Sequence, residues 1–502
     1  MSVAVAVVSL FCDWDNLRFI NVFMLFCGSY ILWLIYNEYF RWYLPPGPWG
    51  LPIIGHLTSI GKNPHLTFMK MRAKYGDVFR IRLGGFPTIV VNGNELIREV
   101  TNARVDDFAG RPRFYLFSLR DDGLSGGLYD DSWRMMKNVA MKSLHRFDNE
   151  NDDGDFNDLL SDEAERLVNA ISRHDGLPFS PKMQIFTTVG SVAYQLCYGR
   201  GHDLNGDEVF KQIVDGSNEF IEFASAGNPV EVLPWLRYFM PWKTSAIRKV
   251  MSFSDEISKE ILANHEETFS ANHIRDILDS YLALDYDKPA LSGLNKSRLS
   301  YTCFEFLTAG YETTATVSLW TLLYMVKHPD VQQKIYDEIS DVLGDSQAQV
   351  SDKSKLPFLE ATITEVMRIR TPVTLALPHA AVRDSRIGGF DVPEGTVVLL
   401  NLYSLAQDES VWKDPHDFRP ERFLTPDGRI DRKKCNLILP FGAGIRKCPG
   451  ENLAKFELFV FLASILQKFE ILPVPGFEYN MTPIHGLTDY PQIFDIIAKH
   501  RK

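Results

Sequence analysis

Residues 439–450 read LPFGAGIRKCPG and stand directly ahead of an apolar, helix-like pattern. Gly442 and Gly444 let the backbone turn tightly and approach a flat partner. Cys448 comes just before the expected helix N-terminus, next to two cationic residues, and amide dipoles and cations both favour the thiolate over the thiol. Because no second Cys or His stands nearby, the thiolate suits a metal that another group already chelates. Haem iron with an axial cysteine is the leading case.

The alternative explanation is a buried structural cysteine, which is the usual explanation of a lone Cys. It would require the rest of the string to be coincidence, at odds on the order of one in 10^5 for the six informative positions. Those positions are Phe441, Gly442, Gly444, Arg446, Cys448 and Gly450.

Composition excludes several classes of protein. The 502 residues carry 53 Lys+Arg against 64 Asp+Glu, a net charge of −11, which argues against nucleic-acid binding. A hydrophobic fraction of 45% is enough for a large core. Six scattered cysteines without a CxxC pair exclude a disulfide scaffold and a zinc ribbon.

The N-terminal region predicts a membrane anchor. Residues 19–36 (FINVFMLFCGSYILWLIY) carry no charge and are just long enough to cross a bilayer core of roughly 30 Å. A buried core helix is the alternative. The proline-rich stretch that follows cannot continue a helix and predicts a stiff spacer. We therefore expect an anchor at 1–43, a hinge at 44–55 and a catalytic body at 56–502.

The sequence from residue 56 onward predicts a mainly α body with a small β portion. Helical periodicity dominates in Tyr301–Lys327, Asp330–Leu343, Phe358–Arg370 and Glu451–Phe469. The strand-like stretches are short, namely Val78–Leu83, Thr88–Asn92 and Thr396–Leu402.

The string at 439–450 resembles the haem-binding loop of the cytochromes P450, the haem-thiolate monooxygenases, and the resemblance extends over essentially the whole chain. It implies the P450 fold, with Cys448 as the axial ligand of haem b iron and Phe441 and Gly442 in the cofactor-binding loop. The chain looks closest to animal microsomal members, in the branch of the steroid 17-alpha-hydroxylases and aryl-hydrocarbon hydroxylases. That implies the endoplasmic reticulum membrane, with a single-pass N-terminal anchor and the body in the cytosol.

Residues 309–314 (AGYETT) resemble the family's oxygen-activation motif inside a long helix. Small Ala309 and Gly310 are expected to open space, and Thr313 can bond a preceding carbonyl. Glu312 and Thr313 offer an acid and an alcohol that could deliver protons, so both are expected to be catalytic. Tyr311 is bulkier than expected there and puts the local pocket shape in question.

Two further sets of residues follow from the resemblance. Glu365 and Arg368 resemble the family's ExxR pair, which closes a structural ion-pair network with an Arg of a later loop, here Arg422 in residues 418–423 (FRPERF).

The second set concerns the haem propionates, which need cationic or hydrogen-bonding partners. The expected partners are Trp133, Lys137, His379, Arg446 and Arg111, and Lys137 stands where the family usually has Arg.

Electrons must come from outside, because the chain has no flavin or dinucleotide fingerprint. A basic group resembles the surface on which members of this family dock an acidic flavoprotein, NADPH-cytochrome P450 reductase. Cytochrome b5 is a second candidate partner. The group comprises Arg134, Lys137, Lys142, Arg146, Lys433, Lys434, Lys447 and Lys455.

The substrate is expected to be an apolar, fairly planar polycycle, either a steroid or an aromatic xenobiotic. Phe220 aligns with a stacking Phe of the aromatic-substrate enzymes, and Ala309 and Thr313 complete the expected substrate pocket. Ala224 stands where steroid 17-alpha-hydroxylases carry a steroid-binding Asn.

The main hypothesis is therefore a membrane-anchored monooxygenase: RH + O2 + two electrons + two protons give ROH and water. An isomerase or dehydratase of the same fold, which needs no reductase, and a non-enzymatic haem sensor are the alternatives. Consumption of NADPH and oxygen in the presence of a reductase separates them.

Overall fold

The computed structural model describes residues 43–119, 123–145, 155–199, 210–216, 223, 228–287 and 296–501, with isolated positions between 21 and 36. The predicted anchor at 19–36 therefore lies partly outside the described residues. Within the described part of the chain, no helix is both long enough and apolar enough to cross a bilayer.

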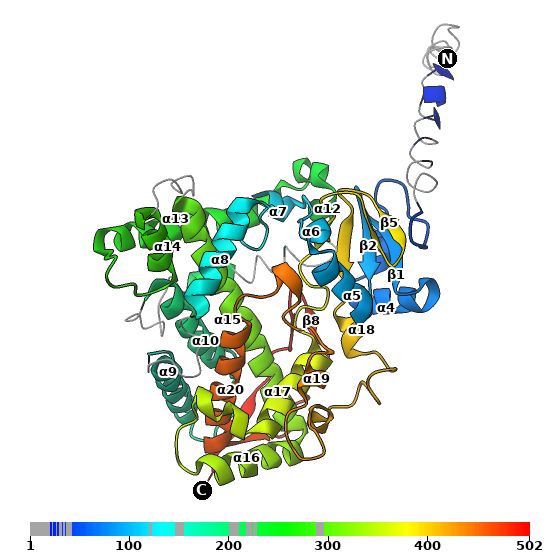
Figure 1. Ribbon diagram of the computed structural model, residues 1–502. Helices are drawn as coiled ribbons and strands as arrows, with labels where there is room; N and C mark the ends of the chain where they lie inside the picture. Colours follow the sequence, from blue (N-terminus) through cyan, green and yellow to red (C-terminus); the bar gives the residue numbers. More distant parts are fainter. Residues whose placement is uncertain are drawn as a thin grey trace, which may run out of the picture.

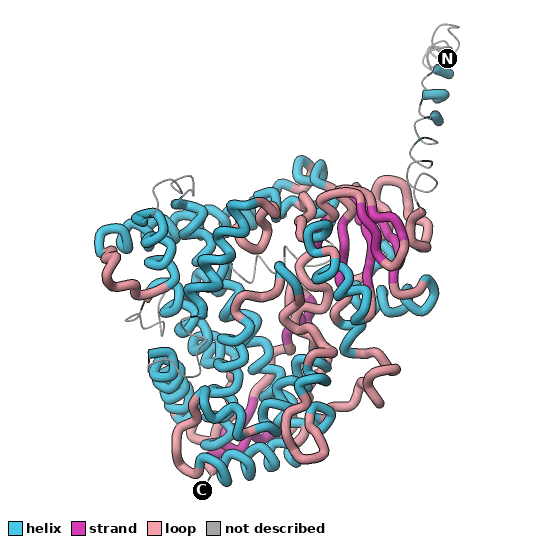
Figure 2. The backbone as a smooth tube through the Cα atoms, viewed as in Figure 1, coloured by secondary structure: helices cyan, strands magenta, loops and turns pink. Residues whose placement is uncertain are grey.

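The body consists mainly of helices, and Figure 2 shows them filling most of the molecule, with the strands gathered mainly on one side. The longer helices are α4 (Pro64–Tyr75), α8 (Asp131–His145), α9 (Asp155–Ser172), α10 (Lys182–Tyr198), α13 (Pro241–Thr268), α14 (Ile277–Asp287), α15 (Lys296–Lys327), α16 (Pro329–Leu343), α17 (Pro357–Arg370) and α20 (Glu451–Lys468). The shorter α-helices are α3 (Leu57–Ile60), α5 (Asn94–Arg98), α6 (Val105–Phe108), α7 (Tyr115–Leu119), α12 (Pro229–Val232), α18 (Tyr403–Ala406) and α19 (Arg432–Cys435).

Tighter or wider helical turns connect these elements. They are the π-helix η1 (Glu99–Ala103) and the 3-10 helices η2 (Pro234–Tyr238), η4 (Val350–Lys355), η5 (Pro420–Phe423) and η6 (Gly444–Arg446). Four long helices begin with proline at their first position, where its missing N–H removes no intrahelical bond. These are α4, α13, α16 and α17.

The strands form one four-stranded sheet and three pairs. The sheet has the order β1-β2-β6-β3, in which β2 and β6 are parallel and the other neighbours antiparallel. The pairs are β10–β7, β4–β5 and β8–β9. The strands are β1 (Val78–Leu83), β2 (Phe86–Val91), β3 (His379–Ala380), β4 (Ser385–Ile387), β5 (Phe390–Val392), β6 (Val397–Leu400), β7 (Phe469–Pro473), β8 (Ile484–His485), β9 (Asp489–Tyr490) and β10 (Ile496–His500).

The expected mainly α body with a small β portion is confirmed. β1 has the predicted bounds, while β2 begins two residues before the predicted Thr88. The largest difference is α15, which begins at Lys296 rather than at Tyr301. Periodicity places the apolar middle of a helix well, but polar first turns such as that of α15 carry little periodic signal.

Helix α15 runs through the helical part of the molecule and packs against α10, α13, α17 and α20 (Figure 1). Its buried side chains include Leu307, Tyr311 and Trp320. The ring of Tyr311 lies edge-on to Phe186 and Phe210, at 5.9 Å from each centroid. Tyr311 therefore fills the core on the α10 side of α15, and its bulk does not narrow the cavity on the other side as its sequence position suggested.

A buried ion-pair network joins α17 to η5. Arg368 donates to both carboxylate oxygens of Glu365, at 2.6 and 2.8 Å, and Arg422 donates to Glu365 Oε1 at 3.1 Å. The Glu365 and Arg368 side chains are completely buried. Arg368 Nη1 also donates to the Ala406 carbonyl at 2.7 Å, so that the network joins α17 to η5 and to the C-terminal end of α18.

Substitution Glu365→Gln should lower the free energy of unfolding by about 3–5 kcal/mol, because it leaves the buried Arg368 without its counter-charge. Urea denaturation followed by far-UV circular dichroism measures this change. The matched control is Asp427→Asn, which breaks the exposed pair between Asp427 and Arg429 and should change stability by less than about 1 kcal/mol. Equal effects of the two substitutions would contradict a supporting role for the buried network.

Candidate active site

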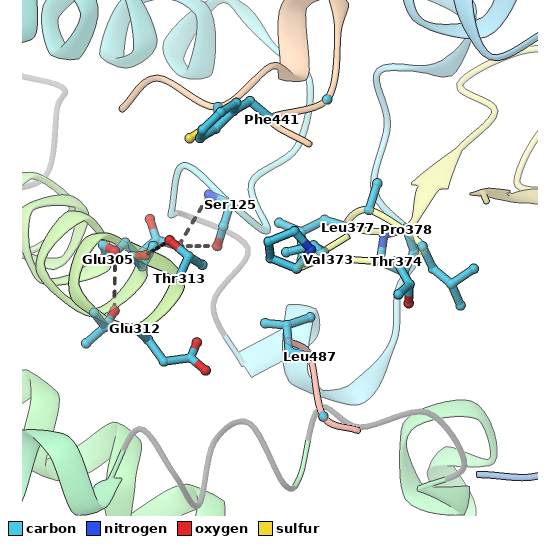
Figure 3. Close-up of a pocket in the computed structure, with 18 of the residues that line it drawn as sticks. Ser125, Glu305, Glu312, Thr313, Val373, Thr374, Leu377, Pro378, Phe441 and Leu487 are labelled. Carbon is cyan, nitrogen blue, oxygen red and sulfur yellow. Dashed lines mark hydrogen bonds between the residues drawn. The ribbon is translucent and has the colours of Figure 1, made fainter. Parts of the chain in front are cut away.

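A cavity of about 1120 Å³ lies between α15 and the loop at 440–450. In Figure 3, Phe441 and Leu487 lie on opposite sides of the cavity, and Thr313 on α15 faces Leu377 across it. The cavity thus brings together the cysteine loop, the motif at 309–314, the segment at 372–378 and the turn between β8 and β9.

Two glycines shape the cysteine loop. The backbone N–H of Gly442 donates to the Leu439 carbonyl and that of Cys448 donates to the Phe441 carbonyl, both at 2.9 Å, which closes the loop on itself. Gly442 and Gly444 have φ of 71° and 68°, a region that favours glycine. A Cβ on Gly444 would overlap the Thr101 carbonyl oxygen. The Gly444 backbone therefore lies close to η1, whereas the sequence predicted a close approach to a flat partner.

The side chain of Cys448 opens onto the cavity, while protein atoms surround it on its other sides. This desolvation raises the pKa of the thiol above its usual value, although the Gly450 N–H, Lys137 and Lys447 act in the opposite direction. The expected electrostatic preference for the thiolate is thus present but outweighed by burial. A coordinated metal ion deprotonates a ligating thiol outright, so this arrangement is consistent with a metal ligand.

Three cations line the cavity next to this loop. Arg111 is buried, and Arg446 and Lys137 are largely enclosed. Burial, together with the charge of Arg446, lowers the pKa of Lys137 to about 8, and burial lowers that of Arg446 to about 10. Their hydrogen-bond partners are backbone carbonyl oxygens, namely those of Ser125, Leu377, Pro378, Ala109, Leu124, Gly127, Ile445 and Lys447.

Among the described residues, no carboxylate lies within ion-pair distance of Arg111 or Arg446. Buried guanidinium groups without a counter-charge are costly. A dianionic planar cofactor with two carboxylates would supply that charge beside Cys448. The residues present therefore fit haem, with Cys448 toward the iron and the cations toward the propionates.

The structure gives Trp133 and His379 different surroundings from Arg446. The indole N–H of Trp133 donates to the Leu124 carbonyl at 2.9 Å, and its ring packs against the Arg446 guanidinium at 3.9 Å. His379 is buried, with Nδ1 at 2.8 Å from the Phe108 carbonyl. Burial and the nearby Arg111 lower the pKa of His379 to about 3, which keeps this side chain neutral.

On α15, the motif at 309–314 presents two faces. The Ala309 side chain is exposed to the cavity, and Thr313 Oγ1 donates to the Ala309 carbonyl at 2.9 Å. Gly310 also lines the cavity, and a Cβ on it would meet only Ala193 of α10, 3.5 Å away.

Glu312 is buried and accepts a hydrogen bond from Thr488 in the turn between β8 and β9. Burial raises its pKa to about 7, against the opposing effects of Thr488 and Lys182. A carboxyl group with this pKa exchanges a proton readily near neutral pH. Phe220, the expected stacking residue of the substrate pocket, lies outside the described residues.

Sequence reasoning missed two residues of this site. The Glu305 carboxylate accepts from the Leu124 and Ser125 backbone N–H groups and thereby binds the segment at 123–125 to α15 (Figure 3). Thr488 was missed as the partner of Glu312. Glu305 could have been identified from the sequence, because it is an acidic residue in an otherwise apolar stretch of helix. The sequence around Thr488 contains no feature that indicates a contact with α15.

The family model "Cytochrome P450" matches residues 45–489. Cytochrome P450 1A1 of Homo sapiens is 37% identical over 463 residues, covering 88% of this chain and 90% of the relative. The proteins of the same name from Macaca mulatta and Rattus norvegicus are each 36% identical over 459 residues, covering 88% of this chain and 90% and 87% of the relatives.

The chain therefore belongs to the cytochrome P450 family, as the sequence predicted. It is a haem-thiolate monooxygenase of the animal microsomal type, close to the aryl-hydrocarbon hydroxylase branch.

Substitution Glu312→Gln should change how stability depends on pH. Since its pKa is about 7 in the folded protein and 4.5 ordinarily, Glu312 binds its proton more tightly when folded. Its contribution to the free energy of unfolding therefore falls as pH rises from about 4.5 to 7, by about 3 kcal/mol in total. Glutamine does not titrate, so the variant should gain stability relative to wild type across this window.

Urea denaturation at several pH values measures the effect, with the exposed Glu165→Gln as a control that keeps the wild-type pH dependence. Parallel curves for wild type and Glu312→Gln would show that Glu312 does not carry a raised pKa.

Proposed function

We propose that the protein hydroxylates a flat, apolar polycyclic substrate of aromatic type, using electrons from NADPH delivered by cytochrome P450 reductase. The observation that carries this proposal is a pair of parallel rings on the cavity wall. Phe114 and Phe117 line the cavity with their ring centroids 6.3 Å apart and their planes 3° from parallel. Flat aromatic molecules gain dispersion and quadrupole interactions from such rings.

The polar groups near these rings favour an aromatic substrate over an oxygenated steroid. Asn228 donates to the Phe223 carbonyl at 2.9 Å and accepts from the Val230 N–H at 3.2 Å, so its amide is used in capping α12. The Glu231 carboxylate accepts from the Leu116 N–H at 3.2 Å. Both of these groups are thus bonded to backbone, whereas a steroid ketone or hydroxyl would need a free partner.

The residues around the reaction site have separate roles in the proposed reaction. Bound haem supplies the activation of dioxygen, held through Cys448. Glu312 holds a proton at its carboxyl group, and Thr313 lines the cavity with its hydroxyl one residue away. Thr488 fixes the Glu312 side chain by donating a hydrogen bond to it. We infer that protons pass from Glu312 by way of Thr313 to the reacting oxygen, with bridging water between them.

Substitution Phe114→Ala should weaken binding of a four- or five-ring polycyclic aromatic by roughly 2–10-fold, since a ring–ring contact contributes about 0.5–1.5 kcal/mol. Titration of the substrate-induced change in the haem absorption spectrum measures the affinity, with a progesterone-like steroid as the comparison ligand. Phe239→Ala, at an exposed position, is the control that leaves affinity unchanged. Tighter binding of the steroid than of the aromatic would overturn the substrate proposal, and a spectrum indifferent to both would do the same.

We also propose that the reductase docks on the basic residues around the cysteine loop. Lys137 of α8 donates to the Ile445 and Lys447 carbonyls, which brings α8 next to this loop. Lys142 and Lys433 are exposed and form no ion pair with the described residues, whereas Lys447 and Lys455 share Glu451.

Arg134, another residue of the predicted basic group, pairs with Asp106 and Asp131, and Arg146 lies outside the described residues. We propose cytochrome b5 as a second partner of the same basic residues.

The double substitution Lys142→Glu with Lys447→Glu should lower reductase-supported turnover and flatten its dependence on salt, because it reverses two charges on this surface. Steady-state NADPH oxidation at several ionic strengths measures both effects. The control Lys259→Glu changes an exposed lysine of α13. Unchanged turnover and salt dependence in the double variant would exclude docking here.

We propose that the protein is anchored in the endoplasmic reticulum membrane with its body in the cytosol. Apolar side chains stand exposed on two segments, Trp49, Leu51 and Ile53 on one and Tyr238, Phe239 and Trp242 on the other. The turn between β1 and β2 joins these segments, because Gly55 pairs with Leu83 and the Gly85 N–H donates to the Val232 carbonyl at 3.2 Å. Exposed apolar patches of this kind are typical of membrane contact.

A further inference from the structure

A cluster of three potential metal ligands lies at the cavity wall, apart from the cysteine loop. It consists of His65 at the start of α4, His485 of β8 and Asp489 of β9. One ligand atom from each residue lies within 4.8 Å of the others. The ring centroids of His65 and His485 are 4.9 Å apart, and His485 Nδ1 lies 2.6 Å from Asp489 Oδ1.

His65 lacks the hydrogen bonds that a buried imidazole normally makes. The residue is 3% exposed, and its Nδ1 is buried without a partner. Across the described residues, neither ring nitrogen of His65 takes part in a hydrogen bond; its ring only packs against those of Tyr403 and His485. Burying such a polar group unpaired is unfavourable, and a ligand on the nitrogen would remove that cost.

The charges at this cluster suit a cation. Asp489 is buried and forms no ion pair with a lysine or arginine in the described part of the chain; its carboxylate is bonded only to His485.

A second cluster of the same residue types differs from this one in that its groups are bonded to partners within the protein. His265, Asp276 and Asp279 also lie close together, but Arg275 donates two side-chain hydrogen bonds to Asp279, at 2.7 and 2.9 Å. His265 bonds both the Ile261 carbonyl and Asp276. Every group there has a partner within the protein, so that cluster needs no ion to explain it.

We propose that His65, His485 and Asp489 bind a divalent transition-metal ion of zinc type, with water as the fourth ligand. Two imidazoles and one carboxylate form a common zinc ligand set, with metal–ligand distances of about 2.0–2.2 Å and hence ligand atoms roughly 3.3 Å apart in a tetrahedron. Small side-chain movements of His65 toward the hairpin and of Asp489 away from His485 reach that geometry. The ion takes the place of the hydrogen between His485 Nδ1 and Asp489 Oδ1, which lie 2.6 Å apart, and the second ring nitrogen of His485 carries the imidazole proton when Nδ1 binds the metal.

Such a site would join α4 to the hairpin formed by β8 and β9. Leu487 in the turn of this hairpin lines the cavity (Figure 3). The neighbouring Thr488 donates to Glu312. The hairpin is held elsewhere by Trp320 Nε1, which donates to the Asp489 carbonyl at 2.8 Å, and by the Asp489 N–H, which donates to the Pro372 carbonyl at 2.9 Å. Metal binding would therefore stiffen one wall of the substrate cavity.

The test uses the full-length, haem-loaded protein, freed of adventitious metal with a chelator. Zinc chloride is then titrated by calorimetry, and the zinc retained after gel filtration is counted by elemental analysis. We expect one tightly bound zinc per chain. His485→Phe and the near-isosteric Asp489→Asn should each weaken it by at least about 100-fold, because each removes a ligand. The control His416→Gln changes an exposed histidine and should leave binding unchanged.

The carbon monoxide difference spectrum of each variant shows whether the fold and the haem site are intact, and Asp489→Asn keeps the test valid if His485→Phe does not fold. The proposal is overturned if the wild-type protein retains no zinc, or if both variants retain as much as wild type. It is also overturned if His265→Gln, and not these variants, abolishes binding. None of these outcomes depends on which substrate the enzyme oxidises.

Discussion

The largely enclosed charge of Arg446 organises the active site. Its guanidinium is held by the carbonyls of Ala109, Leu124 and Gly127 and packs on the ring of Trp133, so the cysteine loop, the segment at 109–127 and α8 meet around one side chain. Carbonyl oxygens satisfy its N–H groups, no carboxylate of the described residues lies within ion-pair distance of it, and Arg111 adds a second positive charge nearby. This requirement for an anion suits the cavity beside Cys448 to a cofactor with two carboxylates rather than to a neutral ligand.

The hairpin formed by β8 and β9 connects three functions that are separate in sequence. Thr488 fixes Glu312, Leu487 forms part of the cavity wall, and His485 with Asp489 forms the proposed metal site with His65. Because the hairpin contributes few residues, a change at one of them alters the positions of the others. A metal ion at its base would couple the order of the cavity wall to the position of the Glu312 carboxyl group.

Much of this site could be predicted from local patterns. Cys448, the two glycines of its loop and the pair Glu312–Thr313 lie within short strings whose residue types demand a particular chemistry. The contact between Glu365 and Arg368 follows from their spacing on one helix. The direction of Gly310 toward α10, the stacking of Trp133 on Arg446 and the pKa of Cys448 could not be predicted, because each depends on a neighbour far away in the chain.

The sequence by itself determined the family, the mainly helical body, the axial cysteine and the acid–alcohol pair, because these depend on periodicity and on residues close together in the chain. Only the tertiary structure decided which groups are buried and what they touch. It placed Tyr311 in the core, bonded Thr488 to Glu312 and brought His65 to His485. It also bonded Arg111 and Arg446 to backbone carbonyl oxygens. Desolvation and pairing are properties of the packed interior, and a linear pattern does not contain them.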